Sequence, residues 1–307
     1  MNMTTQQPSQ QYDITQLINI IWQGKWILVS AFVLSSALSV WLALALPNVY
    51  KAEALLSSTE NNASSMGRLA GNLGGLAGLA GINLSGSDGG DKTQLAIEVL
   101  RSREFFANFD AQHNITPLLL GIEGWDRDNN AIQYDPELYD FNTQKWVRVP
   151  TPPRKVIPSV QEGHAAFIEL LNVEHDKQSG FTTLSMEHMS PHVAKETVDR
   201  LINMINETIR QKDIAKAERS IEYLKKEIAS SEVTELQGGL FDLIQIQIEK
   251  IMLANANPEY VFQVIDPAVV PELKAKPKRA LICVVGAFLG TLIGLIIVLL
   301  RNLKGNN

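Results

Sequence analysis

Residues 276–301 read KPKRALICVVGAFLGTLIGLIIVLLR, and this stretch limits any fold that the chain can adopt. Its central part, 280–300, holds 21 residues without a charge. At 1.5 Å per residue, a helix of that length extends about 31 Å, and a bilayer hydrocarbon core is about 30 Å thick. The pattern therefore predicts a transmembrane helix at 280–300.

A similar run, WILVSAFVLSSALSVWLALAL, occupies residues 26–46. A cleaved signal peptide is the alternative, because Ala43-Leu44-Ala45 resembles a cleavage site. Residues 1–24 contain no Lys or Arg, however, and the run is longer than the usual apolar region of a signal peptide. We expect a second membrane-spanning helix at 26–46.

Three glycines in the later run, Gly286, Gly290 and Gly294, are four residues apart. On a helix they share one face, which lets another backbone approach closely, so we expect them in membrane-helix packing. Neither run contains Asp, Glu, Lys, Arg or His. This argues against an ion pathway through the spans and against a transporter.

Two spans place both tails on the same side of the membrane, but charge does not decide which side. Lys274, Lys276, Lys278 and Arg279 flank the central segment and favour a cytoplasmic middle by the positive-inside rule, which is weak for long translocated domains. The predicted organisation is a tail at 1–25, a span at 26–46, a central domain at 47–279, a span at 280–300 and a tail at 301–307.

The clearest pattern in the central domain is helical and covers 191–230, a length of about 60 Å. Its apolar residues recur at spacings of four and three, as in a coiled-coil seam, which indicates core or inter-subunit packing. A second helical stretch follows, with Gly238-Gly239 as its weak point. The residues assigned to oligomer packing are Leu201, Ile205, Ile214, Ile221, Leu224 and Ile228.

Shorter elements are also readable. Residues 93–114 predict one amphipathic helix with Leu95, Val99 and Phe106 on one side, and 114–160 are irregular. Ser159 and Glu162 have the spacing of a capping box. The remaining expectations are a strand from Asn48, a hairpin turning at 177–180 and a strand at 260–265.

Residues 67–90 are rich in glycine and predict a mobile or partner-ordered loop, with a plain flexible linker as the alternative. Their end approaches a phosphate-binding loop, but Asp91 replaces the glycine before Lys92. A carboxylate there would repel phosphate, so nucleotide binding is not expected.

Residues that could carry chemistry are scarce. The formal net charge of −6 gives no support to nucleic-acid binding. Cys283 is the only cysteine and lies in an apolar run. His188 and His192 are separated by Pro191 and do not form an HExxH motif. We expect no catalytic residue, cofactor or metal.

In the order of its parts, the chain resembles the polysaccharide co-polymerases, the Wzz-type chain-length determinants of the bacterial inner membrane. The resemblance rests on YDITQLINIIWQGKW before the first run, PNVYKAEALL after it, IPSVQEGHAAFIELLNVEHDKQSGFTTLSMEHMSPHVA, and FQVIDPAVVPELKAKPKRALICVVGAFLG. The last motif contains a pre-membrane proline motif of Pro267, Pro271, Pro277 and Lys278, although Lys276 stands where the family often has Ser.

The resemblance implies an α+β fold: a membrane-proximal periplasmic domain with a long projecting helix, flanked by two transmembrane helices. It implies a protein that is not an enzyme and spans the inner membrane twice, with both termini cytoplasmic. Copies would form a ring that acts on a Wzy-type polymerase and its lipid-linked polysaccharide. The implied role is control of the chain length of O-antigen, the polysaccharide of lipopolysaccharide.

Three alternatives remain open. Related co-polymerases for capsule or exopolysaccharide carry or recruit a tyrosine kinase, and the short sequence RNLKGNN after Leu300 favours the kinase-free branch. The others are a structural adaptor of an export pump and an unrecognised membrane-anchored hydrolase. Residues alone do not indicate the polysaccharide, its length or the number of subunits.

Overall fold

The structure is a computed structural model that describes residues 22, 24–59, 88–230 and 234–305. The chain divides into two compact units. The first combines the described residues up to Asn48 with those from Ala275 onwards, and the second is Val49–Lys274. The glycine-rich stretch lies outside the described residues except for its last three positions.

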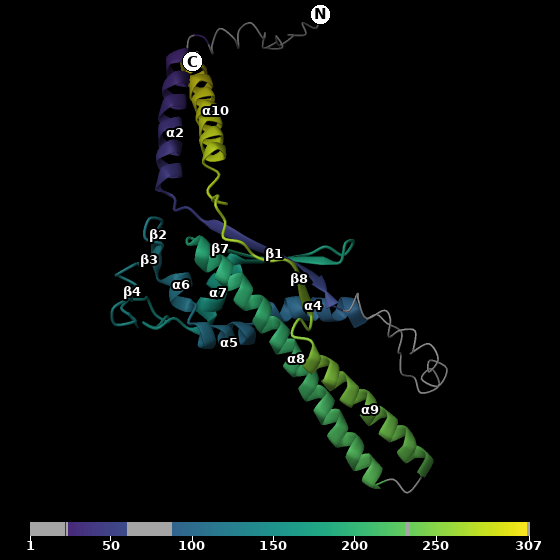
Figure 1. Cartoon of the computed structure of the whole chain (residues 1–307). Coiled ribbons are helices and arrows are strands. Elements are labelled where there is room, and N and C mark those ends of the chain that lie inside the picture. Colours follow the sequence, from purple (N-terminus) through teal and green to yellow (C-terminus); the bar gives the residue numbers. More distant parts are fainter. Residues whose placement is uncertain (1–21, 23, 60–87, 231–233, 306–307) are drawn as a thin grey trace, which may run out of the picture. The chain divides into compact units, whose positions relative to one another are not determined.

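The first unit is a pair of antiparallel helices, α2 (Lys25–Ala45) and α10 (Arg279–Gly305), which lie side by side (Figure 1). Both are long and apolar enough to cross a membrane, with mean hydropathies of 2.2 and 2.8. They overlap the predicted spans 26–46 and 280–300. Which of their residues lie within a bilayer stays a prediction.

The second unit is built on a four-stranded sheet in the order β6-β7-β1-β8. Its strands are β1 (Tyr50–Ser58), β6 (Leu171–His175), β7 (Phe181–His188) and β8 (Phe262–Asp266). Every neighbouring pair is antiparallel. The predicted hairpin is confirmed as β6 and β7, and the two other predicted strands are confirmed as β1 and β8.

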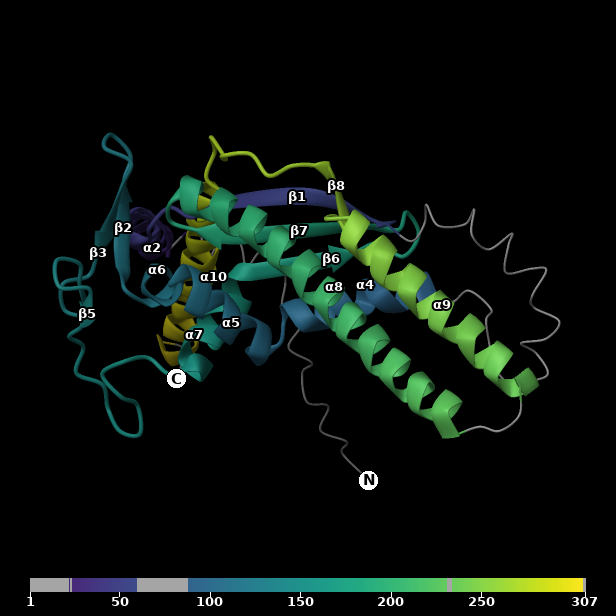
Figure 2. The ribbon, with the colours of Figure 1, turned by 60° about the horizontal axis from the view of Figure 1, so that its bottom comes forward.

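One face of the sheet is covered by helices, and the hydrophobic core lies between them (Figure 2). Along β1 the buried residues alternate, with Ala52, Ala54 and Leu56 inward and Glu53 exposed. This two-residue period is that of a strand with one solvated face. Phe106, Phe109 and Phe167 fill the space between the helices.

The predicted single helix at 93–114 is two helices, α4 (Asp88–Leu100) and α5 (Arg103–His113). Ser102 separates them, because its side chain accepts a hydrogen bond from the Phe105 amide and caps α5. Within α4 the buried residues are Ala96, Ile97 and Leu100, whereas Leu95, expected on the apolar side, is exposed.

Residues 114–160 are more regular than predicted. The short α6 (Thr116–Leu120) leads into a two-stranded sheet of β2 (Ile122–Asp126) and β3 (Ala131–Tyr134). A second pair follows, β4 (Tyr139–Asp140) with β5 (Lys145–Trp146). Next comes α7 (Val160–Leu170), and the predicted capping box of Ser159 and Glu162 is confirmed at its start.

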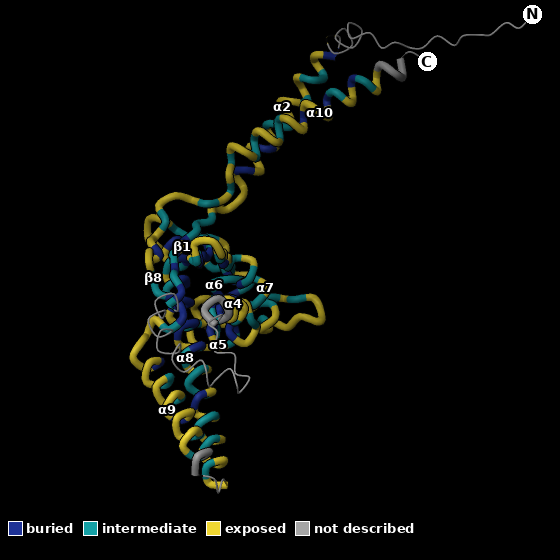
Figure 3. The backbone as a smooth tube through the Cα atoms, turned by 90° about the vertical axis from the view of Figure 1, so that its right-hand side faces the viewer, coloured by how far each residue is buried: buried dark blue, intermediate teal, exposed yellow. Residues whose placement is uncertain are grey.

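The predicted long helix is confirmed as α8 (Pro191–Ser230), followed by α9 (Thr234–Ala256), which runs back along it (Figure 1). Helix α9 continues through Gly238 and Gly239, so the expected weak point does not interrupt it. Buried residues gather in the sheet and the first half of α8, whereas α9 is mostly exposed (Figure 3). The predicted α+β class is confirmed.

Candidate functional site

The predicted glycine face of α10 lies against α2. A Cβ on Gly286 would meet the Ser39 side chain, and one on Gly290 would overlap the Ser35 side chain. A Cβ on Gly294 would lie 2.9 Å from the Ala31 Cβ. The close neighbour of all three glycines is therefore the other apolar helix of the same chain.

The matching residues on α2 were not singled out in the sequence, although the signal is present. Ala31, Ser35 and Ser39 are also four residues apart, so a row of small residues on each helix faces the other. The Ser35 hydroxyl donates to the Phe32 carbonyl oxygen, and the Ser39 hydroxyl donates to the Ser36 carbonyl oxygen. These serines therefore contribute small size, not hydrogen bonds across the pair.

The predicted pre-membrane proline motif is divided between the two units. Pro267 and Pro271 belong to the irregular segment after β8, and Pro277 and Lys278 directly precede α10. Beside them, Arg279 Nη2 donates to Asn48 Oδ1 at 3.2 Å, which links the start of α10 to the residues after α2. A role for the motif stays a prediction.

The residues predicted to pack between subunits fall into two groups along α8. Leu201 and Ile205 are fully buried in the core against the sheet, so they are not accessible to a second copy. The other four residues, Ile214, Ile221, Leu224 and Ile228, are half-buried and lie in the part of α8 along which α9 runs. For these four, packing between subunits stays a prediction.

Asn206, on α8, is a residue that the sequence analysis missed. It is 4% exposed and ties α8 to the start of β8. Its Oδ1 accepts from the amides of Val261 and Phe262, each at 2.8 Å, and its Nδ2 donates to the Phe262 carbonyl oxygen at 2.9 Å. All of these groups are buried, so the amide side chain satisfies backbone groups that water does not reach.

His188, at the end of β7, is 3% exposed and joins two segments. Its Nδ1 accepts from the Ser190 amide at 2.9 Å, which leaves Nε2 to donate to the Leu118 carbonyl oxygen at 2.9 Å. Burial lowers the pKa of His188, so the ring is neutral. His192 lies instead beside the Trp125 ring, and the described residues contain no group of His, Cys, Asp and Glu that could hold a metal.

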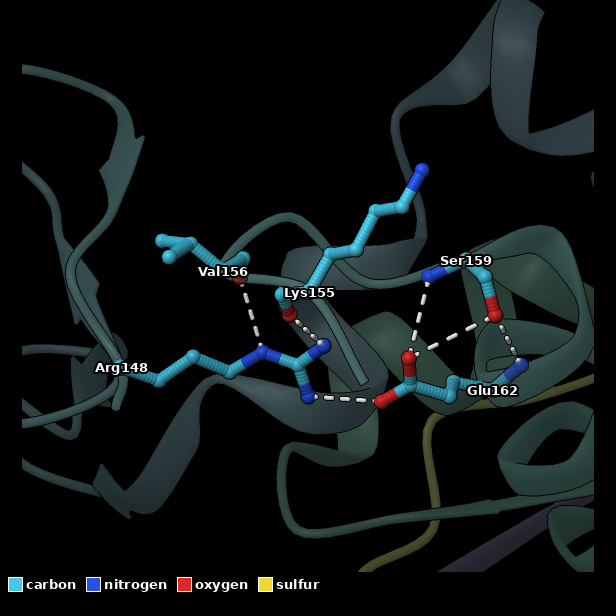
Figure 4. Close-up of polar contacts among 5 residues, drawn as sticks. All are labelled: Arg148, Lys155, Val156, Ser159 and Glu162. Atoms are coloured by element: carbon cyan, nitrogen blue, oxygen red, sulfur yellow. Dashed lines mark hydrogen bonds and ion pairs between the residues drawn. The ribbon is translucent and has the colours of Figure 1, made fainter. Parts of the chain in front are cut away.

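Arg148 closes the loop before α7 (Figure 4). It donates through Nε to the Val156 carbonyl oxygen and through Nη2 to the Lys155 carbonyl oxygen, each at 2.8 Å. Its Nη1 lies 2.8 Å from Glu162 Oε2, while Glu162 Oε1 accepts from the Ser159 amide. The bond from Arg148 lowers the pKa of Glu162. One carboxylate therefore caps a helix and fixes a loop.

Comparison with known families finds two similar stretches. Residues 10–112 match the family model of Wzz, the chain length determinant protein. Over these residues the predicted resemblance to the Wzz-type chain-length determinants is confirmed.

A second family model matches residues 243–303 and is described as "G-rich domain on putative tyrosine kinase". The matched segment runs from within α9 to the end region of α10 and includes the three glycines. It is similar to a domain that is named for its occurrence on kinases.

Two solved structures are similar to this chain. A full-length bacterial polysaccharide co-polymerase shares 12% identity, with a TM-score of 0.40, and the match covers 96% of this chain and 99% of that one. A fragment of WzzB, a polysaccharide co-polymerase from Salmonella Typhimurium, shares 11% identity, with a TM-score of 0.29, over 75% of this chain and 100% of the fragment. No curated protein matches.

Proposed function

We propose that this protein is an inner-membrane regulator of O-antigen chain length. The observation that carries the proposal is the match of residues 10–112 to the chain length determinant family. In this role the protein binds a Wzy-type polymerase and its lipid-linked polysaccharide, and it changes how many repeat units are added before the chain is released. It catalyses no step itself.

The proposed topology has α2 and α10 crossing the membrane, both termini in the cytoplasm and Val49–Lys274 in the periplasm. Support comes from the antiparallel packing of two apolar helices, which brings the start of α2 beside the end of α10. The facing rows of small residues permit a tight pair in lipid, where packing drives helix association.

A ring of subunits is the proposed working form. Because α9 runs along the second half of α8, surfaces of α9 are also available for contact between copies. The outer side of α9 is a candidate, since Phe241, Ile248 and Met252 fall on one side of the helix and are exposed. Adjacent exposed apolar residues of this size commonly mark a protein–protein contact.

A second candidate is a kinase-partnered co-polymerase that serves capsule or exopolysaccharide export. It is favoured by the match of residues 243–303 to a domain named for tyrosine kinases. In this case the regulated polymer differs, and a cytoplasmic kinase joins the assembly. The proposed membrane topology is the same for both candidates.

Deletion of the gene in its source bacterium distinguishes the O-antigen regulator from the kinase-partnered co-polymerase. Loss of a modal band of long lipopolysaccharide on a silver-stained gel, with its recovery from a plasmid copy, supports O-antigen control. An unchanged ladder with altered size or amount of capsule or exopolysaccharide supports the kinase-partnered candidate. If neither polymer changes and an export pump co-purifies with the tagged chain, both are replaced by the adaptor alternative.

A further inference from the structure

The two small sheets after α6 create an aromatic pocket that the proposed function does not use. The pocket has a volume of about 470 Å³, within the usual range for small-ligand sites of about 300–1,000 Å³. Its lining combines apolar rings with polar groups, among them Tyr134, Tyr139, Phe141, Asp140 and Asn142. Such a mixture is typical of ligand sites.

The rings are arranged by contact with one another. Tyr134 stacks on Phe141, with ring centroids 5.2 Å apart and planes 16° from parallel. Tyr139 is buried and packs against Tyr134 at 5.3 Å and edge-on against Trp146 at 5.2 Å. A buried ring therefore supports rings that reach the surface, and the Phe141 side chain is 61% exposed.

The turn that presents Phe141 and Asn142 is fixed by Asp140. One oxygen of Asp140 accepts from the Asn142 amide at 2.9 Å, and the other accepts from the Thr143 hydroxyl at 2.7 Å. The backbone that carries Phe141 and Asn142 is thus held in place before any ligand arrives, which lowers the entropic cost of binding.

We propose that this pocket binds a segment of polysaccharide. Sugars present flat faces of C–H groups that stack on aromatic rings, and their hydroxyls need donors and acceptors such as the Tyr134 hydroxyl and the Asn142 amide. The occupant is assigned as a glycan because the proposed function has the protein act on a polysaccharide, and in this respect the inference rests on the proposed function. A contact here would hold the growing chain on the regulator.

The test is saturation-transfer NMR on the full chain in lipid nanodiscs. The probes are oligosaccharides released by mild acid from the lipopolysaccharide of the source bacterium and, separately, from its secreted polysaccharide. Phe141→Ala should weaken binding about tenfold, and Tyr134→Phe should weaken it less because only a hydroxyl is lost. The matched control is Tyr223→Ala on α8, whose side chain is 63% exposed and lies outside the pocket.

The proposal would be overturned by any of three results: Phe141→Ala binds the probes as well as the unaltered chain does, Tyr223→Ala loses as much binding as Phe141→Ala, or neither probe binds. A change in particle mass for Phe141→Ala would assign the pocket to subunit contact instead and also overturn it. Thermal midpoints within error of the unaltered chain show that the variants are folded. If gene deletion alters chain length while Phe141→Ala binds normally, the proposed function stands and the pocket assignment falls.

Discussion

Arg148 and Glu162 are joined across a loop of the second unit, with Arg148 Nη1 2.8 Å from Glu162 Oε2. The pair is mostly shielded, since the side chains are 13% and 18% exposed. Because Arg148 also binds two carbonyl oxygens, and Glu162 also caps α7, the pair couples the order of residues 149–158 to the start of a helix.

Two substitutions at Glu162 should distinguish its role as the cap of α7 from its ion pair with Arg148. Glu162→Gln keeps a side chain that can complete a capping box, whereas Glu162→Ala removes both the cap and the ion pair. We expect Glu162→Ala to lower the free energy of unfolding by about 1–2 kcal/mol and Glu162→Gln by less. Amide exchange at 149–158 is the readout, and equal exchange in the two variants would contradict the coupling.

Asn206→Ala should cost about 1–3 kcal/mol, because it leaves buried amides of Val261 and Phe262 without an acceptor. Thermal unfolding followed by circular dichroism measures the loss. The control is Gln211→Ala, on the exposed side of α8, where only a bond to Glu207 is lost. Equal effects of the two substitutions would mean that the bonds of Asn206 add no stability.

Gly290→Ile should disrupt the α2–α10 pair, since a Cβ at this position already overlaps the Ser35 side chain. Forcing extra methylenes into a packed contact costs about 1–3 kcal/mol. Thr291→Ile, which adds bulk at an exposed position one residue along α10, should leave the melting temperature in detergent unchanged. Ser35→Ala should also be tolerated, because the Ser35 hydroxyl bonds only within α2.

Acid should weaken the fold through His188. Its pKa is lowered in the folded chain, so the unfolded chain binds a proton first. The contribution of the neutral His188 ring to the free energy of unfolding is complete above the pKa of histidine in the unfolded chain, about 6.5. It declines as the pH falls below that pKa. Burial also lowers the pKa of His113, so His188→Gln should flatten the decline between pH 7.5 and 5.5 without abolishing it. An unchanged slope would contradict the assignment.

Subunit contact through α9 predicts that Phe241→Ser with Met252→Ser lowers the mass of the detergent-solubilised particle. Both side chains are highly exposed, at 57% and 66%, so their replacement should not unfold the protomer. Light scattering after size exclusion measures the mass, and Phe181→Ser in β7 is the control. A particle of unaltered mass would exclude this face of α9 from the interface.

Local patterns predicted much of the fold. The apolar runs, the bounds of α8 and the capping box of α7 depend on residues that are near one another in sequence, so composition and spacing reveal them. The break between α4 and α5 was missed although Ser102 is an ordinary N-cap, because the apolar periodicity continues across it.

Partners that are distant in sequence were not predictable. Periodicity showed that one face of α8 is buried, but not that α9 covers its second half. Asn206 and His188 likewise act on backbone groups of Phe262 and Leu118. The aromatic pocket had a signal, since Tyr134, Tyr139, Phe141 and Trp146 lie close together in the sequence, yet nothing there shows that the rings meet.

The pairing of β1 with β8 gives the second unit a modular topology. Leu56 on β1 pairs with Val264 on β8, and Asn206 on α8 binds the same strand. The segments that lead into and out of the α8–α9 hairpin are therefore joined at its base. The part of the hairpin beyond this junction can become longer or shorter, or change its surface, while the strands of the sheet keep their register. Evolution could therefore change the length of the α8–α9 hairpin without changing the sheet.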